Sequence, residues 1–93
     1  GGQLGIAVEP MRPELADQIG LPRNTQGLMV DQVDPSGPAA EALQPGDVIQ
    51  QVNHQSVRTV DELRGAVAKS GDKPALLLVN RKGQTVFIPV RTR

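Results

Sequence analysis

The sequence predicts a mainly β domain, a partly open antiparallel barrel or sandwich of roughly five to six strands capped by about two to three short helices. Three observations lead to this fold class. The length of 93 residues suits one compact core. The apolar content comes mainly from Val, Leu, Ile and Ala, with a single aromatic residue. Short apolar segments alternate with Gly- and Pro-rich turns. We expect one domain over 1–93, with loop or cloning residues at 1–3 and a tail at 91–93.

The first predicted element is a strand that follows a glycine-containing loop. Leu4, Ile6 and Val8 alternate to one side around Gly5, and Pro10 ends the run. A glycine in this position favours a loop that leads into the strand, because glycine has no Cβ and can adopt a wider range of backbone conformations.

A short helix and a second strand are predicted next. Pro13 suits a first helical turn and Gly20 suits a helix end, so we expect a helix over 13–20. Residues 21–26 then form a loop, and the apolar run over 27–33 reads as a strand.

The middle of the chain combines turn residues with one more helix and two strands. Asp and Pro residues over 34–38 indicate a turn, and the Ala-rich segment 39–43 predicts a helix of one to two turns. A strand over 47–52 then turns back at Asn53-His54 into a short return strand at 55–57.

The clearest local signal marks the start of the next helix. Thr59 and Glu62 match the capping box, in which each side chain bonds the other residue's backbone N–H. The helix is expected over 60–69, closed by Ser70-Gly71, and the sequence ends in a hairpin of strands over 75–79 and 85–90. The apolar stripe of this helix consists of Leu63, Ala66 and Val67.

Composition argues against several classes of function. Ten basic and ten acidic side chains leave no net charge to attract a polyanion, and the lack of Trp and Tyr disfavours base stacking. No apolar run approaches the roughly 20 residues of a membrane span, so we expect neither nucleic-acid binding nor membrane insertion. The sequence contains neither a signal peptide nor cysteine. A mild basic cluster is interpreted as a solvated turn and tail; it comprises Arg81, Lys82, Arg91 and Arg93.

No catalytic or metal-binding group of residues is recognisable. The one histidine, His54, lies near Ser56 in a predicted turn, and no acid is placed to orient the imidazole. Asp31 and Asp34 are interpreted as strand-end and turn residues rather than metal ligands. We therefore expect no catalytic residues, no metal, no cofactor and no enzymatic activity of this chain.

The opening loop has two interpretations. The backbone N–H groups of Leu4, Gly5 and Ile6 can converge on the terminal carboxylate of a peptide, with apolar side chains forming a pocket floor. Alternatively, the alternating residues are simply the first strand of the core, as in most small β domains.

A family resemblance bears on this choice. The matching stretches are LGIAVEPM, PELADQIGLP, GLMVDQVDPSGPAAEALQPGDVIQQVN and SVRTVDELRGAVAKSGDKPALLLVNRKGQTVFIPV. From Leu4 to about Val90, the chain resembles a circularly permuted PDZ domain of the HtrA/Deg serine proteases. It is most similar to the C-terminal (second) PDZ domain of the periplasmic, Do-type members.

The resemblance implies a peptide-binding groove between the first strand and the helix over 60–69. The loop would bind the ligand's terminal carboxylate, and the strand from Ile6 through Ala7 to Val8 would pair with the ligand. Each helix residue also has a simpler interpretation: Val60 packs at the start of the helix, Arg64 lays its alkyl stem over the groove rim, and Val67 belongs to the core. The implied peptide-binding residues are Leu4, Gly5, Ile6, Ala7, Val8, Val60, Arg64 and Val67.

The resemblance also implies a biological setting. The domain would capture C-termini or extended apolar segments of unfolded proteins for a periplasmic serine protease engaged in quality control, with chaperone activity. The alternative is a scaffold domain that contacts neighbouring PDZ or protease domains within an oligomer.

One position departs from the family pattern. Related sequences carry a glycine at the end of the short helix, whereas here Ala42 runs directly into Leu43. Either the helix is one residue shorter, or a non-glycine residue occupies a strained backbone conformation.

Overall fold

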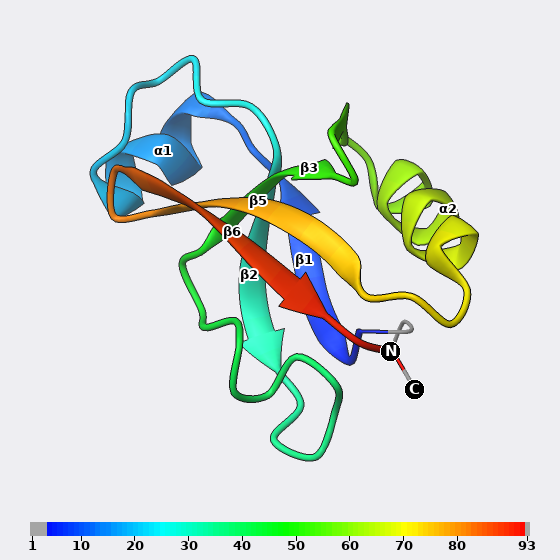
Figure 1. Cartoon of the computed structure of the whole chain (residues 1–93). Helices are drawn as coiled ribbons and strands as arrows, with labels where there is room; N and C mark the ends of the chain where they lie inside the picture. The colour runs from blue at the N-terminus through cyan, green and yellow to red at the C-terminus, as the bar shows by residue number, and fades with distance from the viewer. Residues whose placement is uncertain (1–3, 93) are drawn as a thin grey trace.

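A computed structural model describes residues 4–92. Within that range the chain forms a six-stranded sheet with strand order β1-β2-β3-β5-β6, in which β4 pairs with β3 and every pairing is antiparallel. Two helices flank the sheet (Figure 1), so the predicted fold class is confirmed. The elements are β1 (Ile6–Pro10), α1 (Pro13–Ile19), β2 (Leu28–Val33), β3 (Val48–Val52), β4 (Gln55–Ser56), α2 (Val60–Ser70), β5 (Ala75–Arg81) and β6 (Gln84–Val90).

Strand β1 occupies one edge of the sheet and pairs only with β2. Helix α2 packs against β1 and β3. In Figure 1, α2 stands on the side of β1 opposite to β2. An edge strand presents unpaired backbone N–H and C=O groups along its free side, and here that side faces the helix.

The core is built by period-two alternation on the strands and by one stripe of α2. Leu77 and Val79 of β5 are fully buried, whereas Leu76 and Leu78 are only partly buried. The residues of α2 that enter the core are Leu63 and Val67, at the four-residue spacing of one helix face.

The predicted capping box of α2 is confirmed. The Oγ1 of Thr59 accepts a hydrogen bond from the Glu62 N–H at 3.0 Å, and the Glu62 carboxylate accepts one from the Thr59 N–H at 3.2 Å. Both bonds satisfy donors that the first turn of a helix leaves without partners. They fix where α2 begins, and therefore which of its residues face β1.

The predicted helix over 39–43 is wrong, because this segment forms consecutive turns. The N–H of Leu43 bonds the C=O of Ala39 at 3.0 Å, but Pro45 cannot donate the bond that would extend a helix. Neither Ala42 nor Leu43 adopts a positive φ. The missing glycine therefore causes no left-handed strain here.

The interpretation of Arg81 as a solvated turn residue is also wrong. Its guanidinium donates to both oxygens of Asp47, at 2.9 and 2.7 Å, and to the C=O of Ala42 at 2.9 Å. Asp47 is 1% exposed, and these hydrogen bonds raise the pKa of the Arg81 guanidinium. The pair fastens the turns that precede β3 to the end of β5.

Candidate functional site

The loop that precedes β1 is fixed at its two carbonyl groups. Leu4 is 3% exposed, so its side chain is anchored in the core. The C=O of Leu4 accepts a hydrogen bond from the Ala39 N–H at 3.3 Å, and the C=O of Gly5 accepts one from the Asp34 N–H at 2.8 Å. Among residues 4–92, the N–H groups of Leu4 and Gly5 donate to no partner. The loop thus uses its acceptors internally and keeps donors available.

Gly5 gives the loop its shape. Its φ of 69° lies in the left-handed region, which glycine adopts without steric penalty. A left-handed residue interrupts the strict alternation of an extended chain, so that adjacent N–H groups can point to the same side, as in an anion-binding nest.

Along β1 the side chains alternate as the sequence predicts. Ile6 and Val8 are partly buried and pack against the core, while Ala7 is exposed. The register of the β1–β2 pairing shifts between Ala7 and Val8, which is a β-bulge of the kind common at sheet edges. The apolar side chains thus face the interior, and the backbone edge remains free.

The three α2 positions expected to line a groove differ in burial. Val60 is partly buried, Arg64 is exposed, and Val67 is 3% exposed within the core. Spacings of four and three residues place them along one face of the helix. The structure therefore brings the loop, β1 and this helix together. Val67 is observed in the simpler of its two expected roles, as a residue of the core.

An acidic pair marks the far end of β1. The Oε1 of Glu9 accepts a hydrogen bond from Arg12 at 3.1 Å, and Asp31 of β2 lies within hydrogen-bonding reach of Glu9. Burial, followed by the neighbouring Glu9, raises the pKa of Asp31. Hydrogen bonds with Asp31 and then Arg12 lower the pKa of Glu9. The Asp31 carboxylate is thus the less favourable member of the pair.

Replacing Asp31 with asparagine is expected to raise the Tm at pH 7 by roughly 1–3 °C. Because the folded-state pKa of Asp31 is raised, Asp31 favours the folded state only in its protonated form. That contribution to stability is complete below the unfolded-state pKa of about 3.9 and is lost as pH rises through the folded-state pKa. The gain should therefore shrink as pH approaches about 4. Thermal unfolding of both proteins at several pH values measures this; a gain independent of pH would contradict it.

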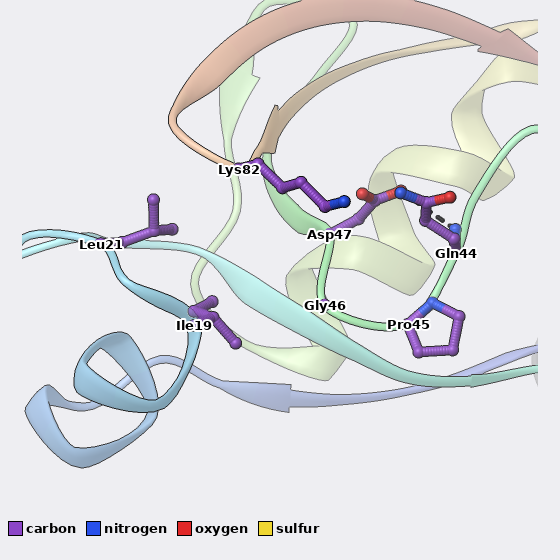
Figure 2. Close-up of a pocket in the computed structure, with 7 residues that line it drawn as sticks. All are labelled: Ile19, Leu21, Gln44, Pro45, Gly46, Asp47 and Lys82. Carbon is purple, nitrogen blue, oxygen red and sulfur yellow. Dashed lines mark hydrogen bonds between the residues drawn. The ribbon is translucent and has the colours of Figure 1, made fainter.

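A separate hollow lies away from this region. A cavity of about 210 Å³ lies between Ile19 and Leu21 on one side and the turn before β3 on the other, with Lys82 at its rim. Figure 2 shows the Lys82 side chain extending toward Asp47, whose carboxylate accepts the Gln44 N–H at 3.0 Å. None of the sequence-predicted site residues lines this cavity, and no sequence signal indicated it.

Two further properties concern the described part of the chain. No cluster of three or more His, Cys, Asp or Glu side chains suits a metal ion within residues 4–92. In the same range, every helix is too short or too polar to cross a membrane.

Comparison with known proteins identifies the family to which the chain belongs. The family model described as PDZ domain matches residues 29–81, more than half of the 93 residues. Together with the fold, this shows that the chain belongs to the PDZ domain family, a family of binding domains, and is not itself an enzyme.

The relatives point to one branch of that family. "Probable periplasmic serine endoprotease DegP-like" proteins from Chlamydia trachomatis and Pseudomonas putida strain F1 are 33% and 37% identical over 97% and 96% of the chain. The chain spans only about a fifth of their length, 18% and 19%. The resemblance to HtrA-type PDZ domains is confirmed, whereas assignment to the second PDZ domain stays a prediction.

Two solved structures agree with this placement. The HtrA-type protease AlgW with a decapeptide is 34% identical, with a TM-score of 0.81 over 95% of this chain and 27% of that one. The HtrA3 PDZ domain bound to the phage-derived ligand FGRWV is 29% identical, with a TM-score of 0.78 over 95% and 81% of the two chains.

Proposed function

We propose that this chain is a non-catalytic peptide-recognition domain that adds the C-terminal segment of a polypeptide to β1 as an extra antiparallel strand. The free edge of β1 beside α2, immediately after the Gly5 loop, is the observation that carries this proposal. Peptide ligands in the similar AlgW and HtrA3 structures support it.

The N–H groups of Leu4, Gly5 and Ile6 would hold the terminal carboxylate. Each charge-assisted hydrogen bond of this type contributes about 1.5–3 kcal/mol. Burial of a Val- or Leu-sized terminal side chain adds roughly 1.5–3 kcal/mol. Ordering a short flexible peptide opposes binding, so we expect a dissociation constant of about 1 μM, which corresponds to roughly −8 kcal/mol.

Side chains of α2 would set the ligand preference. Val60 is apolar and only partly buried, which favours an apolar ligand residue two positions before the C-terminus. The exposed Arg64 would lay its alkyl stem along the rim. Val67, although buried, would contribute the inner wall of the terminal pocket next to Ile6.

The host is proposed from the relatives. They are named as periplasmic serine endoproteases, and we propose that this domain serves as a substrate-recognition part of such a protease. It would capture C-termini or extended apolar segments of unfolded proteins in the periplasm. The quality-control and chaperone roles expected from the resemblance belong to the same proposal.

Isothermal calorimetry on the purified domain tests the carboxylate mechanism. We expect a peptide ending in Val to bind at least about tenfold more tightly than the same peptide with an amidated C-terminus, because amidation removes the anionic acceptor. A control peptide ending in Asp shows whether the terminal pocket prefers apolar residues. Equal affinities for the free and amidated peptides would overturn the proposal.

A scaffold role is the second candidate, and a different surface favours it. Val86 and Phe87 of the edge strand β6 are 38% and 54% exposed, and the His54 ring lies 5.8 Å from that of Phe87. Such a surface can pack against a neighbouring PDZ or protease domain of the same assembly. Deleting this domain from the parent protein and measuring its mass in solution tests the role; an unchanged oligomer would count against it.

A further inference from the structure

We infer that the loop over residues 34–39 positions the carboxylate-binding amides, and that Gly37 is a positioning residue for a ligand it does not touch. This inference rests on the proposed function and extends it to a segment outside the groove. The segment follows β2 and lies behind the Gly5 loop, on the side where that loop's carbonyl groups are bonded.

The first argument concerns the peptide planes. All peptide bonds of the described chain are trans, so each C=O points opposite to the N–H of the following residue. The C=O of Leu4 and the N–H of Gly5 share one plane, and the C=O of Gly5 and the N–H of Ile6 share the next. Because Ala39 and Asp34 bind these two carbonyl groups at 3.3 and 2.8 Å, the N–H groups of Gly5 and Ile6 are directed away from the 34–39 loop.

The same hydrogen bonds change the strength of the donors. A carbonyl group that accepts a hydrogen bond polarises its own amide, and linked hydrogen bonds strengthen one another by about 10–30%. The N–H groups of Gly5 and Ile6 are therefore better donors to a carboxylate than free amides would be.

The second argument is the close approach of two glycines, which leaves little room for a side chain on either. A Cβ placed on Gly37 would lie 3.3 Å from the Cα of Gly5, and a Cβ placed on Gly5 would lie 3.3 Å from the Cα of Gly37. Both distances are tighter than ordinary carbon contacts. The absence of a side chain at residue 37 thus sets how closely the two loops approach, and with it the position of Gly5.

The 34–39 loop is itself held by local bonds. The Asp34 carboxylate accepts hydrogen bonds from the Ser36 N–H and hydroxyl at 2.9 Å each, and these lower the pKa of Asp34. The N–H of Gly37 donates to the C=O of Asp34 at 2.9 Å. This turn holds its shape without help from the groove, so it can serve as a fixed support.

Gly37→Ala tests the inference directly. Gly37 does not adopt a positive φ, so alanine fits the backbone; its methyl group would meet the Cα of Gly5 at 3.3 Å and, within the loop itself, the Cβ and C=O oxygen of Asp34 at 3.4 Å. We expect affinity for the free-carboxylate peptide to fall about tenfold, while affinity for the amidated peptide changes less than about twofold. Gly65→Ala is the matched control, because a Cβ there meets nothing within 4 Å, and it should change neither affinity.

The outcomes separate the two proposals. If the unmodified domain does not distinguish the free from the amidated peptide, the proposed function fails. If it does distinguish them and Gly37→Ala keeps the same ratio, or weakens both peptides equally, the positioning role is wrong and the proposed function stands.

A second measurement on the unmodified domain covers the case in which Gly37→Ala does not fold. The N–H groups of Asp34 and Ala39 hold the loop carbonyl groups, so ligand binding should slow their hydrogen exchange. We expect greater slowing with the free-carboxylate peptide than with the amidated one at equal saturation. Equal slowing by both peptides would overturn the inference.

Discussion

Replacing Arg81 with methionine is expected to destabilise the folded domain by about 3 kcal/mol, because it leaves a buried carboxylate without its cation. Asp47 is 1% exposed, and of its side-chain hydrogen bonds within residues 4–92 it would keep only the one from the Gln44 N–H. The C=O of Ala42 would also lose its donor. The estimate lies at the lower end for broken buried pairs, since the Arg81 side chain is 34% exposed and water can reach part of the site.

Urea denaturation measures the loss, and an exposed ion pair provides the control. Arg23 pairs with Asp17 where both side chains are largely exposed, 65% and 51%, so Arg23→Met should cost less than about 1 kcal/mol. Adding Asp47→Leu to Arg81→Met should recover part of the stability, because the unpaired charge is then absent. Similar losses for Arg81→Met and Arg23→Met would show that the buried pair contributes little.

Replacing Gly27 with alanine is expected to destabilise the domain by roughly 2–6 kcal/mol, from two separate causes. The φ of Gly27 is +133°, a conformation that side-chain-bearing residues rarely adopt. A Cβ there would also lie 2.5 Å from the C=O oxygen of Ile49 and 2.9 Å from Val48 Cγ1. The neighbouring strand β3 cannot yield to backbone overlap without losing its own pairing.

Gly46→Ala separates the two causes. Gly46 also has a positive φ, +94°, but a Cβ there meets nothing within 4 Å, so only the conformational penalty of about 1–3 kcal/mol applies. Thermal unfolding should place the Tm of Gly27→Ala well below that of Gly46→Ala. Equal values would mean that the contact with β3 relaxes easily.

Much of the fold follows from local sequence signals. The capping box at Thr59 and Glu62, the Pro13–Gly20 helix bounds and the terminal hairpin were predicted within a residue or two of their observed limits. These signals work because each depends on hydrogen bonds or steric limits between residues close in sequence. The prediction of a helix over 39–43 was wrong, because the conformation of so short a segment is decided by its surroundings rather than by helix propensity.

The candidate site was recognisable only in part. Alternation identified Ile6 and Val8, and Gly5 marked a loop, but the same pattern fits an ordinary core strand. The family resemblance favoured the groove, and the unpaired edge of β1 beside α2 supplied the structural argument. The support from the 34–39 loop left no signal in the sequence, because its bonds join segments about 30 residues apart.

The sequence by itself determined the order of the elements, where most of them begin and end, and the PDZ-like motif, since these depend on neighbours along the chain. Only the tertiary structure decided that Arg81 partners Asp47 and that Gly37 lies too close to Gly5 for either residue to carry a side chain freely. The reason is physical: burial, charge pairing and close backbone approach depend on which distant segments meet, and a linear pattern does not encode that directly.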